Sequence, residues 1–341
     1  MDTTEAAGEF LVDVAERLML RCDPAPIRAM MARACGGQLD AKGPDGQRAS
    51  TLTISGTPFE ASVSGGKGRF TSAIRYVTET ATQEMVFGSR VAAQLTAIRD
   101  LVAWLPNADE KVAAMLQSFV ATLYPDPAKV STRDRSATWI GIVHHPAAPQ
   151  HAARLKVYGG LQIVPGAMNR LCTEWPGFAG LASVPDEDRI ITPIAAAIEV
   201  DARGEVNHKV YLKTRYTDVA APMKLVRNFG HQAWEVLSEL VRHGVDPAEL
   251  HRHNFFVCCS RGAGGSGFGL HLSARRDEDF TPLVSELASR HHGSTRAVNA
   301  LAEAAECCGA TWRYSAIGLG FSADHGIDKL NVYGTPTWGT A

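Results

Sequence analysis

Three short segments of the chain repeat one β-strand pattern, and this repeat constrains the fold more than any other feature. The segments are RLKVY at residues 154–158, NHKVY at 207–211 and KLNVY at 329–333. Residues two apart in a strand share a face. Each segment therefore has cationic or polar groups and a tyrosine on one face, and Leu, Val or His on the other. Three matching faces predict one interior lined by ammonium groups and aromatic rings.

The repeated segments fall within a series of predicted β-hairpins. Strand-like runs joined by Gly-, Pro- or Asp-containing turns predict hairpins at 50–63 with 68–79, 138–145 with 153–160, 189–200 with 205–214, 254–260 with 267–274, and 314–322 with 329–334. The first is expected to turn at Gly65 and Gly66. Apolar periodicity predicts helices at 5–35, interrupted near Pro24 and Pro26, and at roughly 84–122, 165–182, 222–252 and 280–308.

Closure of the ten strands explains the polar faces. An open sheet would expose two long edges, whereas a barrel has none. We predict an α+β fold: a ten-stranded antiparallel β-barrel with a solvent-filled lumen, surrounded by helices in repeated αββα units. It is expected at about 45–337, after a helical segment at 5–35, within one domain covering residues 1–341. The alternative is an ordinary α+β sheet whose lysines and tyrosines face water.

Cations on the predicted inner face indicate an anion site. Several cations in an interior are costly unless an anion compensates them, and a di- or triphosphate does so through charge-assisted hydrogen bonds. Any one of the lysines could instead be a surface residue whose stem alone is buried. The set is Arg75, Arg154, Lys156, Lys209, His271 and Lys329.

The tyrosines and one glutamate complete the predicted site. Tyr158, Tyr211 and Tyr333 occupy equivalent positions; such rings are often core residues, yet beside an anion site they can shelter a carbocation from water. Glu60 interrupts an apolar run, where an unpaired carboxylate is costly. It is expected either to pair with a nearby arginine or to accept a hydrogen bond from an N–H of an acceptor.

Composition excludes several other functions. The formal net charge of −2 gives no global basic field for nucleic acid or anionic membranes. No apolar run reaches the roughly 18 residues of a membrane span, and the N-terminus lacks a signal-peptide pattern. The seven cysteines form no CxxC motif, so reduced thiols and a cytoplasmic location are expected. The glycine-rich segment 261–269 joins two strands and is interpreted as a hairpin turn rather than a phosphate loop.

No metal-binding pattern is evident. The His pairs have no suitably spaced carboxylate or Cys partners, and the DDxxD cluster that holds magnesium diphosphate in metal-dependent isoprenoid enzymes is missing. Lysine and arginine are therefore expected to neutralise the diphosphate themselves, with no metal or cofactor and no magnesium requirement.

These residues resemble the ABBA aromatic prenyltransferases of the dimethylallyltryptophan synthase type, over about residues 45–337. The best local match is GTPFEAS at 56–62 followed by IRYVTE at 74–79. The resemblance implies that Glu60 binds the indole N–H, Arg75 the diphosphate, and that the Lys-x-Tyr pairs at 156/158 and 209/211 supply diphosphate lysines and shielding tyrosines. Tyr333 matches another shielding tyrosine, and the chain length is similar to that of a bacterial branch.

Two positions depart from the family pattern. Asn207 stands where an arginine is usual, and His271-Leu-Ser273 replaces a Gln-x-Tyr pair. These two changes are expected to affect the chain length of the donor, the position of the acceptor that is prenylated and the identity of the acceptor.

The resemblance implies a reaction without magnesium in a monomer or homodimer. A dimethylallyl group would pass from dimethylallyl diphosphate to tryptophan or another indole by electrophilic aromatic substitution. The alternatives are a carbazole, a phenol or a cyclic-peptide side chain as acceptor, or a non-catalytic barrel that binds a phosphorylated metabolite. The expected diphosphate ligands are Arg75, Lys156, Lys209, Asn207, His271 and Lys329.

Overall fold

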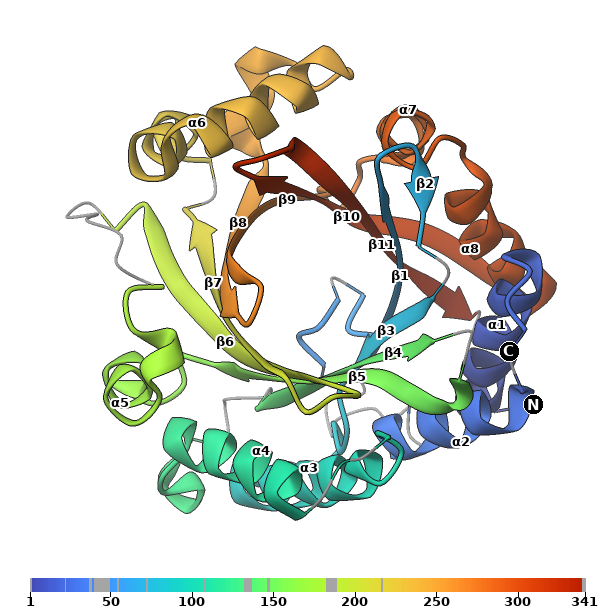
Figure 1. Ribbon diagram of the computed structural model, residues 1–341, viewed down its shortest axis with the longest axis vertical. Helices are drawn as coiled ribbons and strands as arrows, with labels where there is room; N and C mark the ends of the chain where they lie inside the picture. The colour runs from blue at the N-terminus through green and yellow to red at the C-terminus, as the bar shows by residue number, and fades with distance from the viewer. Residues whose placement is uncertain are drawn as a thin grey trace.

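Ten strands close into one antiparallel barrel, as predicted (Figure 1). The computed structural model describes residues 2–338 except 22, 37–38, 40–49, 54, 72, 107, 109, 132–136, 146–147, 182–188 and 216. The ring consists of β1 (Phe59–Gly66), β3 (Ile74–Thr78), β4 (Thr138–His145), β5 (Ala148–Gly160), β6 (Ile191–Asp201), β7 (Val206–Thr214), β8 (Asn254–Gly262), β9 (Gly265–Ser273), β10 (Ala310–Ser322) and β11 (Gly326–Trp338). Pairing of β1 with β11, with Ser62 opposite Tyr333, closes it. A short strand β2 (Arg69–Phe70) pairs with β1 beside the ring.

Helices lie around the outside of this ring (Figure 1). Asp2 caps the first helix in a capping box with Glu5, and Asp23 and Pro24 begin the second at the predicted interruption. The helices are α1 (Thr3–Arg17), α2 (Pro24–Cys35), α3 (Phe87–Val102), α4 (Glu110–Leu123), α5 (Ala167–Glu174), α6 (Ala221–Arg242), α7 (Thr281–His291) and α8 (Arg296–Cys307), with 3-10 turns η1 (Pro127–Lys129), η2 (Pro176–Phe178) and η3 (Pro247–Arg252).

Side chains along each strand point alternately outward, into the core beneath the helices, and inward, into the interior of the barrel. Outward residues such as Val157, Leu212 and Val257 are 0% exposed beneath the helices, and burying each such side chain contributes about 1.5–3 kcal/mol. Their strand neighbours must then face inward. A one-residue slip would reverse both faces, so the core fixes which side chains reach the interior.

The first hairpin differs from its prediction. Its strand begins at Phe59 rather than at residue 50, and the chain turns at Lys67 and Gly68, whose φ angles of 54° and 75° suit a tight turn. Gly66 instead belongs to the strand and pairs with Arg69. A Cβ added at Gly66 would lie 1.9 Å from the carbonyl oxygen of Asp328 on β11, so no larger residue fits there. The glycine thus permits a close approach of β1 to β11. Residues 45–49 of the predicted barrel lie outside the described residues.

Among the described residues, no helix is long and apolar enough to cross a membrane.

Candidate active site

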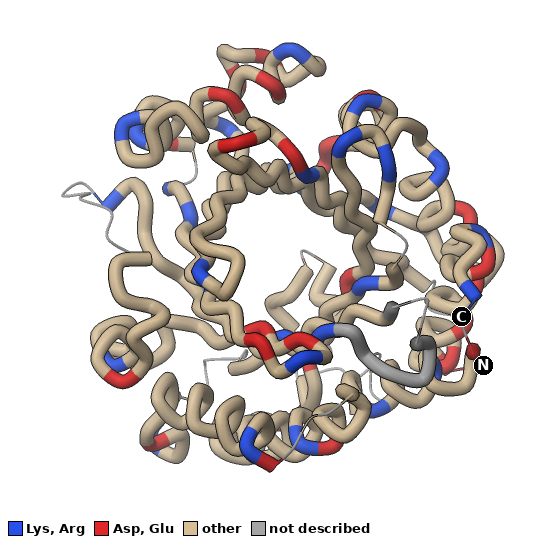
Figure 2. Tube along the Cα trace, in the orientation of Figure 1, with Lys and Arg blue, Asp and Glu red and all other residues tan. Residues whose placement is uncertain are grey.

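The connections between strands distinguish the two ends of the barrel. The links β6–β7, β8–β9 and β10–β11 all turn at one end of the barrel, which we call the turn end, and the segments leading into helices leave from the other, the helix end. Charged residues cover the outer helices, and a smaller set of both signs follows the ring of strands (Figure 2). The position of an inward residue along its strand thus tells which of these two ends its side chain lies nearer.

Two lysines from neighbouring hairpins meet in the interior. The Lys156 ammonium donates a hydrogen bond to the Tyr211 hydroxyl at 2.6 Å and lies 4.3 Å from the centroid of the Tyr158 ring. Lys209 donates to Oε2 of Glu199 at 2.8 Å. Glu199 also lies 3.6 Å from Arg154, measured from Oε1 to a guanidinium nitrogen. Lys156 is thus held by aromatic groups and Lys209 by a carboxylate.

The opposite wall contributes a second pair of cations. Arg75 on β3 donates to Ser64 at 2.6 Å and to Asn331 at 3.4 Å. Lys329 lies against Gly320, where an added Cβ would be 3.1 Å from the Cβ of the lysine. Residues from β3, β5, β7 and β11 therefore surround one region of the interior.

Removal from bulk water, together with the crowding of like charges, shifts the pKa values of the cations in this region. Enclosure within the barrel, followed by the charges of Arg75 and Lys209, lowers the pKa of Lys329 to about 8, although this side chain stays accessible to solvent. Burial and the charge of Lys156 lower the pKa of Lys209. An anion placed among these groups would favour their charged forms and reverse the shifts.

His271 is neutral at pH 7 in this surrounding. Burial, followed by the charges of Lys156, Lys329 and Lys209, lowers the pKa of its imidazole to about 4. The ring lies 5.7 Å from that of Tyr333 between centroids. It can therefore offer a neutral N–H to a ligand, but it adds no positive charge to the site.

Tyrosine rings lie between the cations and the helix end. Tyr158 and Tyr211 are 5.7 Å apart between ring centroids, and Trp139 packs 6.2 Å from Tyr158. Burial raises the pKa of Tyr158, Tyr211 and Tyr333 further above the ordinary value, so all three are neutral phenols at pH 7.

Glu60 lies near the helix end of β1, away from the lysines. Its Oε1 accepts a hydrogen bond from the Ser315 hydroxyl at 2.5 Å, and burial raises the pKa of its carboxyl to about 7. Ser315 occupies a β-bulge in β10, between Tyr314 and Ala316. The arginine partner that a purely structural glutamate would need is absent among the described residues.

Comparison with solved structures gives the same barrel over nearly the whole chain. 5-Dimethylallyltryptophan synthase from Streptomyces coelicolor aligns with a TM-score of 0.73 at 18% identity, covering 97% of both chains. 6-Dimethylallyltryptophan synthase from Micromonospora olivasterospora, in complex with DMASPP and Trp, gives 0.69 at 16% identity over 98% of this chain and 97% of that chain. AnaPT from Neosartorya fischeri gives 0.65 at 13% identity over 96% and 93%. No family model and no curated protein matches the sequence.

The chain has the fold of the ABBA aromatic prenyltransferases.

Within this barrel, two site groups were not predicted from the sequence. Glu199 stands alone in an apolar strand, which is the same signal that identified Glu60, so the sequence did contain a cue. Burial would raise the pKa of Glu199, but Lys209 and Lys156 outweigh it and lower that pKa to about 2. Ser315 had no such cue, because its orientation depends on a bulge.

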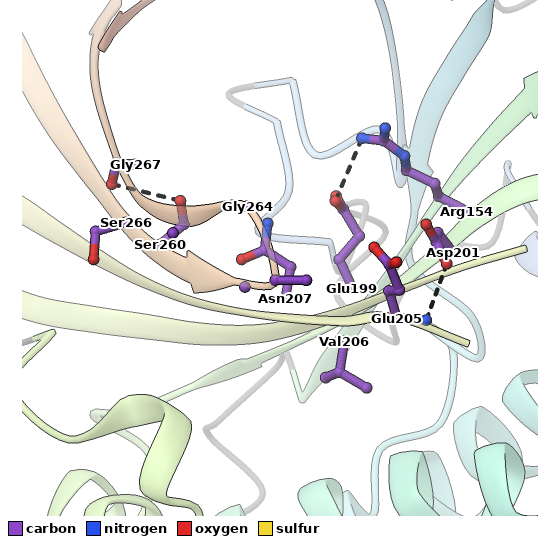
Figure 3. Close-up of a pocket in the computed structure, with 13 residues that line it drawn as sticks. Arg154, Glu199, Asp201, Glu205, Val206, Asn207, Ser260, Gly264, Ser266 and Gly267 are labelled. Atoms are coloured by element: carbon purple, nitrogen blue, oxygen red, sulfur yellow. Dashed lines mark hydrogen bonds and ion pairs between the residues drawn. The ribbon is translucent and has the colours of Figure 1, made fainter. Parts of the chain in front are cut away.

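The turn end of the barrel contains a cavity of about 300 Å³. Figure 3 shows Arg154 directed toward Glu199 there, with Asn207 and Ser260 on neighbouring strands. The glycine-rich turn between β8 and β9 forms part of its wall, so this segment is a hairpin turn, as predicted. The amide oxygen of Asn207 is buried with no hydrogen-bond partner among the described residues.

The described residues contain no group of three His, Cys, Asp or Glu side chains arranged to hold a metal ion.

Proposed function

We propose that this protein transfers a prenyl group from an allylic diphosphate to an aromatic acceptor, with dimethylallyl diphosphate as donor and an indole as acceptor. The observation that carries the proposal is the excess of positive charge in the barrel. Arg75, Lys156, Lys209 and Lys329 surround one region, where Glu199 accepts a hydrogen bond from Lys209. Uncompensated cations in an interior are costly, and a diphosphate would supply the missing negative charge.

The order of side chains along the barrel supports the reaction class. The diphosphate would lie among the cations, and its allylic carbon would face Tyr158, Tyr211 and Tyr333. As the carbon–oxygen bond breaks, its electron pair leaves with the diphosphate, where the cations stabilise the developing charge. The allylic cation meets neutral phenol faces, which attract it without forming a bond.

Glu60 would orient the acceptor at the other end. Its carboxylate would accept the indole N–H, which makes the ring more electron-rich as it attacks the allylic cation. A carbon–carbon bond forms, and the proton on the attacked ring carbon passes to a base. No step in this scheme requires a metal ion, because the lysines and Arg75 act on the leaving group.

The experiment is to incubate the protein with dimethylallyl diphosphate and tryptophan and to follow the acceptor by mass spectrometry. A mass gain of one prenyl group, with equimolar release of diphosphate, supports the proposal. Diphosphate binding without transfer to any member of a panel of indoles, carbazoles, phenols and cyclic dipeptides would favour a non-catalytic barrel. Transfer only to a non-indole member would retain the reaction class and replace the acceptor.

A further inference from the structure

We infer that Lys213 binds the α-carboxylate of the acceptor, so that the acceptor is a free amino acid rather than a cyclic peptide or an uncharged indole. This inference rests on the proposed function and adds a specificity residue to it. Lys213 is not one of the residues proposed to bind the diphosphate.

Lys213 belongs to the inner face of β7 but not to the cation cluster. It follows Lys209 and Tyr211 at intervals of two residues, so the three share a face. Tyr211 separates it from the diphosphate region, toward the helix end. Its ammonium lies 5.5 Å from the centroid of the Phe256 ring on β8, the residue opposite it in register. A ring face orients the ammonium without neutralising its charge.

Among the residues that the structure describes, this ammonium has no ionic partner. Lys209 is paired with Glu199 and Lys156 with Tyr211, whereas none of the described carboxylates lies within ion-pair distance of Lys213. The side chain is neither buried nor fully exposed. It is therefore a cation available to a ligand bound at the helix end of the interior.

Lys213 stands across the barrel from Glu60. Counting around the ten-strand ring, β1 and β7 are five strands apart in either direction and form opposite walls. Glu60 is the second residue of β1 and Lys213 the penultimate residue of β7, so both lie near the helix end. An acceptor whose indole N–H faces Glu60 would extend its other end toward Lys213. In tryptophan, that end carries the α-carboxylate.

A neighbouring side chain can meet the α-ammonium group. Asn254 precedes Phe256 by two residues on the same face of β8, and its amide oxygen is buried with no hydrogen-bond partner among the described residues. An ammonium donor would satisfy this oxygen. A cation on β7 and an unsatisfied carbonyl oxygen on the neighbouring strand β8 match the two charged groups of an amino acid, and a cyclic peptide has neither charge.

The test compares L-tryptophan with its methyl ester, in which an uncharged ester group replaces the carboxylate. Binding of L-tryptophan and of L-tryptophan methyl ester is measured by titration calorimetry for the wild type, Lys213→Met and Lys213→Arg. Lys129→Met, which removes a lysine that is 84% exposed, is the matched control. Loss of one charged hydrogen bond predicts that Lys213→Met weakens tryptophan binding by about tenfold or more. Binding of the ester should be unchanged, and Lys213→Arg should retain the wild-type preference.

Kinetics separate this inference from the proposed function. In Lys213→Met, KM for tryptophan should rise while KM for the donor stays constant, and Lys213→Glu should prefer the ester. Equal losses for acid and ester, or no loss for either, would overturn the inference. If the wild type prenylates indoles but does not distinguish acid from ester, only the inference fails. If it prenylates nothing, the proposed function fails, and calorimetry still decides on Lys213.

Discussion

Lys209 donates a hydrogen bond to Glu199 at 2.8 Å, and this contact occupies a cation that the diphosphate is proposed to use. The incoming anion must compete with the carboxylate, whose charge also repels it. We expect Glu199→Gln to tighten binding of a thiolodiphosphate analogue by ~fivefold, the scale of one partly screened charge interaction. Titration calorimetry in low and high salt measures this. Weaker binding in the variant would instead mean that Glu199 positions Lys209 for the donor.

Removal of Lys156 should have the opposite effect. Its ammonium is oriented by the hydroxyl of Tyr211 and the ring of Tyr158, so no large rearrangement is needed before it meets an anion. Lys156→Met should weaken binding of inorganic diphosphate by roughly 1.5–3 kcal/mol, the cost of one charged hydrogen bond. Calorimetry of Lys129→Met provides the control, and equal affinities in the two variants would remove Lys156 from the anion site.

Chelation tests the metal-free proposal. Since the lysines and Arg75 are proposed to stabilise the leaving diphosphate, EDTA should leave the initial rate of prenyl transfer unchanged, and added magnesium should not increase it. The measurement is product formation by chromatography before and after dialysis against the chelator. A rate abolished by EDTA and restored by magnesium would require a metal-bound diphosphate.

The fold could be predicted because the same alternation that buries Val157 and Leu212 also turns Lys156 and Tyr211 inward. Closure followed from the cost of exposed edges. The turn of the first hairpin could not be predicted in this way. Gly66 serves a close approach to β11, and a glycine that permits contact has the same sequence signature as one that permits a turn.

The side-chain contacts between neighbouring strands were also beyond the sequence. Nothing along the chain indicates that Glu199 takes up Lys209, because the two lie on different strands and their contact depends on register. Ser315 reaches Glu60 only because a bulge adds one residue to β10. Periodicity predicts which side chains of a strand point inward, but it does not predict which of these side chains bind one another.

Substitution of Glu60 should reduce turnover without affecting the donor. Burial raises the pKa of this carboxyl to about 7, so the form that accepts an N–H is populated as pH rises through 7. The wild-type rate should therefore rise over this range. Glu60→Gln should lose about 10²–10⁴-fold in rate together with that pH dependence, while its affinity for inorganic diphosphate stays at the wild-type value. A variant with wild-type turnover would exclude Glu60 from the reaction.

The same carboxyl should affect stability with a definite sign. Because its pKa is higher in the folded chain than the ordinary 4.5, the folded state favours the protonated form, and stability falls as pH rises from about 4.5 to about 7. Glu60→Gln removes the ionisable group, so its stability does not show this fall with pH. Thermal unfolding should show the variant gaining stability over the wild type at pH 8 relative to pH 4. A constant difference would mean that the carboxyl is better solvated than its burial indicates.

Lys329 should set the alkaline limit of activity. Its pKa of about 8 in the unliganded protein, caused by its enclosure within the barrel and by Arg75 and Lys209, means that its charge is lost as pH rises through 8. For the donor, kcat/KM reports the free enzyme and should fall over this range, because one diphosphate ligand becomes neutral. Lys329→Arg keeps its charge at every accessible pH and should move the fall to higher pH. If the two profiles coincide, the alkaline limit belongs to another group, and the Lys156 variant would be the next to titrate.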